Sequence, residues 1–143
     1  MKVKYTAHAT ATGGGREDGH AETDDGKVSV TTNIPKEMGG SGGAGTNPEQ
    51  LFAVGFATCF LGAMHAAAGR EKKNLPSGTS VTANVSFADR EDNVGFTIVS
   101  ELVAKVPGYS AAETEALMQA ADRICPYAHA LRNPSELKLT AAA

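Results

Sequence analysis

The stretch NPEQLFAVGFATCFLGAMHAAAG, residues 47–69, is the longest apolar segment of the chain. It begins with Asn47, a favourable N-cap, followed by Pro48 at the first helical position and the acidic Glu49 in the first turn. The body of the segment is apolar on nearly every side, as in helices that are buried all round. We therefore expect a long central helix that begins at Pro48 and ends near Gly69.

This apolar segment is also long enough to cross a bilayer. However, Thr58, His65 and two glycines interrupt it, and segments rich in β-branched residues flank it. We therefore expect the buried helix of a soluble domain and no membrane partner. Residues 1–10 alternate polar and apolar side chains and contain no hydrophobic leader, so a cytoplasmic location is expected.

Shorter segments on either side of the helix have the alternation and β-branched content of strands. We predict strands over Val3–Thr12, Lys27–Asn33, Ser80–Ala88, Gly95–Val106 and, at the end of the chain, Glu136–Thr140. A second helix is predicted over Ala111–Ile124, because Ser110 and Glu113 have capping-box spacing. Pro126 should stop or kink that helix. The order of elements indicates an α+β fold, and the length fits a single domain over residues 1–143.

The formal net charge of −3 gives no sign of a nucleic-acid partner or an anionic membrane. The glycine-rich segment Met38–Thr46 lacks the GxxxxGK[ST] and GxGxxG patterns of nucleotide-binding loops, so we interpret it as a tightly turning loop. The two cysteines are therefore the residues from which a function can be argued.

Cys59 and Cys125 are expected to be thiols in a reducing compartment, where disulfides that do form are usually transient and catalytic. Cys59 lies in the middle of the apolar helix. Burial raises a thiol pKa there, so an inert core thiol is the default. A reactive Cys59 requires a cation from elsewhere in the fold. Arg16, which follows three glycines, is either that cation or an exposed loop residue.

Two histidines raise the alternative of a metal site. Cys125 and His129 have i, i+4 spacing, but Pro126 disturbs the helix that this spacing needs. Cys59 and His65 lie about 240° apart around a helix, so their side chains diverge. Since no CxxC pair is present either, we expect neither a zinc site nor a thioredoxin-type site.

Four bulky apolar residues recur at every fourth position of the predicted helix: Phe52, Phe56, Phe60 and Met64. Such a stripe is usually plain core packing. The functional alternative is that part of it walls an apolar pocket beside Cys59.

Several short motifs resemble those of a known family, the organic hydroperoxide resistance proteins of the OsmC-like superfamily. The matching segments are GTNPEQLFA (45–53), CF (59–60), CPY (125–127), GGR (14–16) and GG (39–40). The resemblance covers nearly the whole chain, and the two cysteine motifs together make it specific. A small departure is AH at 128–129, where the family often has Ser and Asn.

The resemblance implies an OsmC-like fold, with antiparallel sheets around a long buried central helix, in an intertwined homodimer. It implies that Cys59 attacks an organic hydroperoxide, that Cys125 resolves the product as a disulfide, and that Arg16 and Glu49 form the polar pair that activates Cys59. The implied reductant is a dihydrolipoyl group on a lipoylated protein, with no metal and no bound cofactor. A pocket at the phenylalanine stripe would favour bulky hydroperoxides over hydrogen peroxide.

Helix geometry adds an expectation about Glu49 and Cys59. Residues at this spacing lie about 15 Å apart along a helix and about 280° apart around it. One Arg16 guanidinium is not expected to touch both groups on a straight helix. Either the helix breaks near Gly55, or Glu49 comes from the partner chain; we favour the partner.

Two other functions stay open at this point. The chain could be a non-catalytic redox sensor, whose cysteines oxidise and switch a partner, although it lacks an obvious DNA-binding helix or basic face. It could also be a structural domain with two inert thiols. Steady-state turnover of an organic peroxide distinguishes an enzyme from a sensor, and rapid alkylation of Cys59 excludes an inert thiol.

Overall fold

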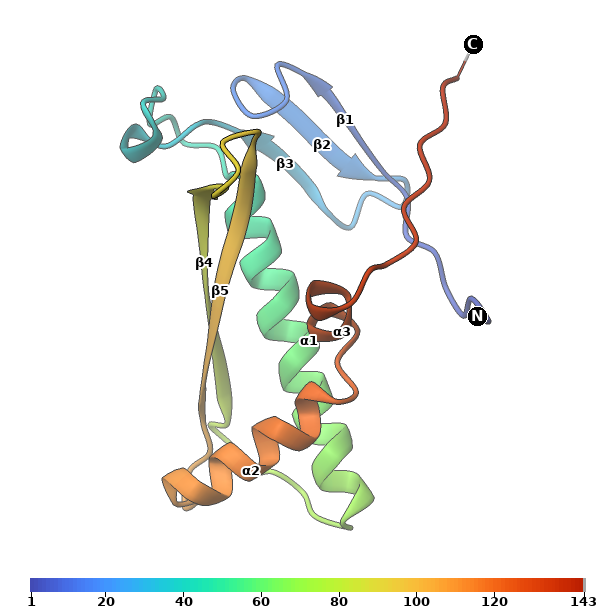
Figure 1. The fold of residues 1–143 in the computed structure, drawn as a ribbon, viewed down its shortest axis with the longest axis vertical. Helices are drawn as coiled ribbons and strands as arrows, with labels where there is room; N and C mark the ends of the chain where they lie inside the picture. The colour runs from blue at the N-terminus through green and yellow to red at the C-terminus, as the bar shows by residue number, and fades with distance from the viewer. Residues whose placement is uncertain (143) are drawn as a thin grey trace. The chain divides into compact units, whose positions relative to one another are not determined.

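The computed structural model of the protein describes residues 1–142 and divides into two compact units. The first unit is Met1–Phe52, and the second begins at Ala53. Helix α1, Pro48–Arg70, contributes its first turn to the first unit and its remainder to the second. The predicted α+β class is confirmed, since helices and two small antiparallel sheets make up the structure (Figure 1).

The first unit contains a three-stranded antiparallel sheet in the order β1-β2-β3. Its strands are β1 (Ala9–Gly13), β2 (Gly19–Thr23) and β3 (Ser29–Thr32). The predicted first strand begins too early, because Ala9 pairs with Thr23, the last residue of β2. Residues before Ala9 therefore have no neighbouring strand with which to form a ladder.

The glycine-rich segment after β3 is a turning loop, as predicted. It follows a short 3₁₀ helix, η1 (Lys36–Met38), and then returns to the end of the sheet, where Thr46 forms a parallel bridge with Thr32. The Asn33 N–H donates to the Thr46 carbonyl at 3.0 Å. The loop thereby delivers the start of α1 next to the end of β3.

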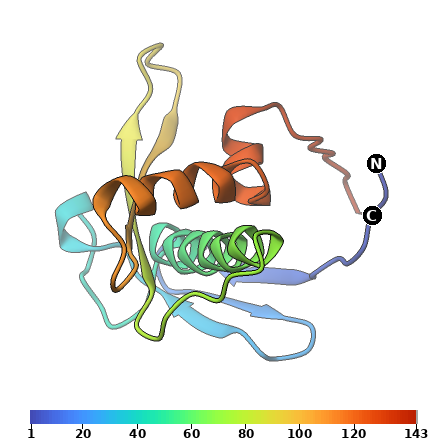
Figure 2. The ribbon, with the colours of Figure 1, turned by 90° about the horizontal axis from the view of Figure 1, so that it is seen from below.

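The second unit combines most of α1 with a hairpin and two further helices. The hairpin consists of β4 (Ser80–Asp89) and β5 (Phe96–Lys105), paired antiparallel along their whole length. The helices are α2 (Ala111–Asp122), which begins with the predicted Ser110–Glu113 capping box, and α3 (Pro126–Arg132). Figures 1 and 2 show the hairpin running along α1, with α2 beside the same helix.

Helix α1 buries one side of its apolar surface in this chain. The buried residues are Phe56, Phe60, Ala63, Met64, Ala67 and Ala68. Val54, by contrast, is 68% exposed. By length and composition α1 would pass as a membrane span, a test that core helices of soluble proteins pass as well. The stripe of buried residues is what a core helix needs.

The C-terminal part departs from the prediction in two places. The second helix stops before Pro126, as predicted, but α2 ends at Asp122 and not at Ile124. Pro126 then occupies the first position of an unpredicted helix, α3, because a proline lacks only a donor that is unpaired there anyway. The predicted strand Glu136–Thr140 has no strand structure. Its residues are exposed and pair with no neighbouring strand.

Candidate active site

The two cysteines, distant in sequence, lie next to each other in the second unit. Their Sγ atoms are 3.5 Å apart, within range of a thiol–thiol hydrogen bond, and both are free thiols. Cys125 is fully buried, whereas Cys59 is partly exposed. Cys59 is thus the thiol that an external molecule reaches more easily, and Cys125 is positioned to react with it.

The start of α3 positions Cys125. Cys125 is the N-cap of this helix, with Pro126 after it, and its side chain does not cap the helix. The Cys125 N–H donates instead to the Ala121 carbonyl of α2 at 2.9 Å, which ties the cysteine to the end of that helix. The Sγ atom is therefore left to face Cys59.

Tyr127 holds α3 against α1. Its ring stacks on Phe56 with centroids 5.8 Å apart. A Cβ added at Gly55 would lie 2.7 Å from the Tyr127 hydroxyl oxygen, so only glycine leaves room for the ring at this distance. Gly55 therefore serves as a seat for Tyr127. It does not break α1, which runs unbroken through it, so the predicted alternative of a broken helix is wrong.

The environment of Cys59 opposes its ionisation. The pKa of this thiol is raised, chiefly by burial, and pairing with Cys125 adds to the increase. A hydrogen bond from the Tyr127 backbone acts in the opposite direction, because it stabilises the thiolate. Within its own unit, then, Cys59 is not activated. A reactive Cys59 therefore still requires a cation from elsewhere, as expected from the sequence.

Arg16 and Glu49 form a two-pronged ion pair in the first unit. The two guanidinium nitrogens of Arg16 donate to the two carboxylate oxygens of Glu49, at 3.0 and 2.8 Å. The Arg16 side chain is 39% exposed and that of Glu49 is 12% exposed. This parallel geometry is the strong form of the arginine–carboxylate interaction, and it fixes the plane of the guanidinium.

Each partner of this pair stabilises the charged form of the other. The pKa of Glu49 is lowered, first by the hydrogen bond from Arg16, and the pKa of Arg16 is raised, first by the same bond. The helix start holds Glu49 in place: Asn47 is the cap, and its side chain accepts from the Gln50 N–H at 2.8 Å. The predicted N-cap is confirmed.

The Arg16–Glu49 contact joins residues of one chain. The expectation that Arg16 meets a Glu49 supplied by a partner chain is therefore wrong for this pair. The cause lies in the loop between β3 and α1, which returns to the sheet beside the turn that carries Arg16. Sequence spacing alone did not reveal that return.

The four residues predicted to wall a pocket have different surroundings. Phe56 and Phe60 line a cavity of about 760 Å³, together with side chains of β5, α2 and α3. Met64 is fully buried, and Phe52 lies in the first unit. Neither cysteine lines the cavity. The cavity is therefore separate from the thiol pair, although Phe56 on its wall stacks on Tyr127, which follows Cys125 in α3.

The sequence did not indicate the roles of three residues that shape these two pairs. They are Gly55, Tyr127 and Glu17, whose carboxylate accepts four hydrogen bonds beside Arg16. Tyr127 belongs to the matching motif CPY, but nothing in that motif indicated that its ring packs against Gly55. Within residues 1–142, no three His, Cys, Asp or Glu side chains gather as a possible metal site.

Comparisons with known proteins agree with the geometry. The profile of a family described as OsmC-like protein matches residues 40–140. An organic hydroperoxide resistance protein of Xanthomonas axonopodis pv. citri is 46% identical over 141 residues, covering 99% of this chain and 96% of that protein.

Solved structures give the same result. An organic hydroperoxide resistance protein of Legionella pneumophila has a TM-score of 0.82 at 40% identity, covering 92% of both chains. The organic hydroperoxide resistance protein OhrB of Bacillus subtilis has a TM-score of 0.80 at 35% identity, covering 91% of this chain and 93% of that one. The matched regions thus extend over both units and over the positions of both cysteines.

Proposed function

This chain belongs to the organic hydroperoxide resistance proteins of the OsmC-like family, and on that basis we propose that it is a cysteine-based peroxidase that reduces organic hydroperoxides to alcohols. The observation that carries the proposal is the 3.5 Å separation of the Cys59 and Cys125 sulfurs. A partly exposed thiol with a buried second thiol within reach is what a two-cysteine peroxidase requires.

The reaction proceeds in three balanced steps. The Cys59 thiolate attacks the distal oxygen of the hydroperoxide, the O–O bond breaks, and the leaving alkoxide takes a proton to become the alcohol. Cys59 is then a sulfenic acid, which condenses with the Cys125 thiol to release water and form a disulfide. An external dithiol reopens that disulfide by exchange and becomes a disulfide itself.

Arg16 is the cation that this chemistry needs, and Glu49 orients it. The raised pKa of Cys59 means that few thiolates form without help. A guanidinium stabilises a thiolate by charge, and its planar fork can hold a peroxide oxygen near the sulfur. The two-pronged bond to Glu49 supports this assignment, because it leaves the guanidinium fixed in orientation and charged.

We further propose a homodimer in which the Arg16–Glu49 pair of one chain serves Cys59 of the other. The helix argument still applies, since α1 is unbroken and places residues at the spacing of Glu49 and Cys59 about 15 Å apart along its axis. The exposed apolar residues Val54, Phe96, Val99 and Val103 support a second chain covering α1 and β5.

A dihydrolipoyl dithiol on a lipoylated protein is the proposed reductant, and the cytoplasm is the proposed location. Phe56 and Phe60 support an apolar substrate, because they wall a cavity large enough for an alkyl chain. Bulky organic hydroperoxides should therefore be preferred over hydrogen peroxide.

The test is steady-state consumption of cumene hydroperoxide with dihydrolipoamide or glutathione as reductant. Many turnovers with dihydrolipoamide, and slow turnover with glutathione, are expected. A single oxidation without turnover by any dithiol would instead indicate a redox sensor. Equal rates with both reductants would refute the lipoyl assignment alone.

A further inference from the structure

Glu17, the residue after Arg16, holds the turn between β1 and β2 against a distant part of the first unit. Its carboxylate accepts from the Asn33 side chain at 2.7 Å, the Ile34 N–H at 2.9 Å and the Ser41 hydroxyl at 2.6 Å. A fourth, longer bond comes from the Ser41 N–H at 3.5 Å. One side chain thus joins the turn to the residues after β3 and to the glycine-rich loop.

The residue on the other side of Arg16 is fixed as well. The buried Thr32 hydroxyl donates to the Gly15 carbonyl at 2.5 Å. Arg16 is therefore flanked by two anchors that both lead to the end of β3. Its backbone has little freedom, although its side chain is 39% exposed.

The same region fixes Glu49. The Asn33 side chain, which donates to Glu17, accepts from the Gly45 N–H at 2.8 Å, and the Thr46 N–H donates to the Thr31 carbonyl at 2.9 Å. Thr46 immediately precedes the cap of α1. One polar network, centred on Glu17 and Asn33, therefore connects the turn that carries Arg16 with the helix start that carries Glu49.

We propose that Glu17 is a positioning residue: by clamping the β1–β2 turn onto residues 33–41, it holds the Arg16 guanidinium in register with Glu49. The inference deepens the proposed function, on which its catalytic consequence rests. Its geometric part, the alignment of Arg16 on Glu49, can be measured without any turnover.

The clamp requires a carboxylate. Its donors lower the pKa of Glu17 to about 2, first the Ser41 side chain and then the Asn33 side chain, so the group is ionised at neutral pH. A carboxylate is an acceptor at both oxygens, whereas a glutamine amide would turn an NH₂ group toward donors that already need an acceptor. Glu17→Gln therefore keeps the shape of the side chain but breaks part of the clamp.

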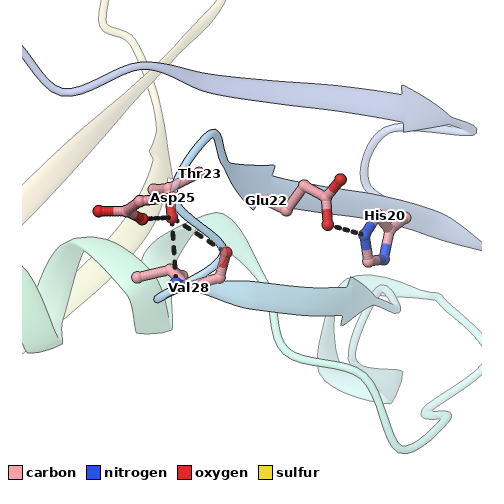
Figure 3. Close-up of polar contacts among 5 residues, drawn as sticks. All are labelled: His20, Glu22, Thr23, Asp25 and Val28. Carbon is pink, nitrogen blue, oxygen red and sulfur yellow. Dashed lines mark hydrogen bonds and ion pairs between the residues drawn. The ribbon is translucent and has the colours of Figure 1, made fainter.

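The first experiment follows the Glu49 carboxyl by NMR pH titration in a Cys59→Ser background. Because Arg16 lowers the pKa of Glu49, Glu17→Gln should raise it toward the ordinary range. The matched control is Asp25→Asn. Asp25 is a carboxylate in the next turn of the same sheet. It accepts from the Thr23 hydroxyl at 2.7 Å (Figure 3) and from the Lys27 N–H at 3.0 Å.

The control should leave the pKa of Glu49 unchanged. An unchanged Glu49 titration in Glu17→Gln, or an equal shift in Asp25→Asn, would overturn the inference. If Glu17→Gln does not fold, Ser41→Ala removes one donor and should raise the pKa of Glu49 in the same direction by less. No shift in that variant would overturn the inference too.

The second experiment measures peroxidase kcat/KM in a double-mutant cycle. Glu17→Gln should lower it roughly ten- to a hundredfold with Arg16 present, and have almost no further effect in Arg16→Ala. An equal loss in both backgrounds would show that Glu17 does not act through Arg16. If Glu17→Gln shifts the Glu49 titration as expected but the wild-type protein consumes no peroxide, the proposed function is refuted and the clamp is left intact.

Discussion

The Arg16–Glu49 pair and the Cys59–Cys125 pair are held in place by different interactions. Arg16 and Glu49 are aligned by a network of hydrogen bonds among partly exposed polar groups. The cysteines are aligned by packing: α3 is seated on α1 through Tyr127, and Cys125 is fully buried.

The difference predicts what disturbs each pair. Charge-assisted hydrogen bonds are sensitive to pH and to the loss of one donor or acceptor. A packed contact is sensitive to added or removed volume and hardly at all to charge. In the proposed reaction the thiol pair supplies the redox chemistry, and the polar pair supplies the charge that starts it.

The largest effect is expected from the thiols themselves. Cys59→Ser should abolish peroxide consumption, because no sulfur remains in the position of attack. Cys125→Ser should keep one oxidation of Cys59, which then accumulates as sulfenic and later sulfinic acid. Mass spectrometry of peroxide-treated variants checks this. The reverse pattern would exchange the roles of the two residues.

Removal of the cation should have the next largest effect. Arg16→Ala should raise the pKa of Cys59 further and lower kcat/KM on the order of a hundredfold. Arg16→Lys should also be impaired, since a point charge does not replace the planar fork. The pH profile of Cys59 alkylation is the measurement, with Arg90→Ala, in the β4–β5 turn, as control. An unchanged profile in Arg16→Ala would remove Arg16 from the mechanism.

Mixed dimers test whether the two pairs meet across an interface. Cys59→Ser and Glu49→Ala are each expected to be inactive alone. After joint unfolding and refolding, one chain still offers Cys59 and the other an intact Arg16–Glu49 pair. Activity should return, up to half the wild-type level per mixed dimer. Verified mixed dimers as inactive as their parents would place both pairs of a site in one chain.

A methyl group should disturb the packed pair without touching the polar one. Gly55→Ala places a Cβ within 2.7 Å of the Tyr127 hydroxyl oxygen, and such overpacking costs about 1–3 kcal/mol. Formation of the Cys59–Cys125 disulfide should slow as well. Gly69→Ala, where a Cβ meets nothing within 4 Å, is the control and should be neutral or slightly stabilising. Urea unfolding measures the stability of each variant. Equal stabilities of Gly55→Ala and Gly69→Ala would contradict the proposed close packing of Tyr127 on Gly55.

The smallest effect expected is a pH dependence of the stability that Glu17 contributes to the first unit. The pKa of Glu17 is about 2 in the folded chain and 4.5 ordinarily, so the folded state binds fewer protons between these values. The stability that Glu17 contributes is complete above pH 4.5 and is lost as the pH falls toward about 2. The difference in unfolding midpoint between wild type and Glu17→Gln should therefore shrink over that range. A constant difference would mean that the charge of Glu17 is irrelevant.

Local signals predicted much of the fold. The cap at Asn47, the apolar body of α1 and the Ser110–Glu113 capping box each act within a few residues, so each was visible in the sequence. Pro126 was correctly taken as a stop for the preceding helix, but the helix that begins at it was not predicted, because proline is also a favourable first residue of a new helix. The strand at Glu136–Thr140 failed because a strand needs a partner, which local pattern does not supply.

The candidate site was harder to predict from the sequence, since its contacts join residues that are far apart along the chain. Arg16 and Glu49 come together only because the loop after β3 returns to the sheet, and Cys59 meets Cys125 only because α3 is seated on Gly55. The family resemblance named these four residues without the contacts that hold them. Glu17 had no signal of its own in the sequence, because its donors come from the distant residues 33–41.

The sequence separation of the two cysteines has a thermodynamic consequence. They lie 66 positions apart, and the segment between them contains the hairpin and α2. A Cys59–Cys125 disulfide would close nearly half of the chain into a covalent loop. A loop of this size lowers the entropy of the unfolded chain, which should stabilise the folded state by about 4 kcal/mol. Each catalytic cycle would thus alternate between a tethered and an untethered polypeptide. In the proposed reaction, the disulfide form that precedes reduction would be more resistant to heat and proteolysis than the dithiol form.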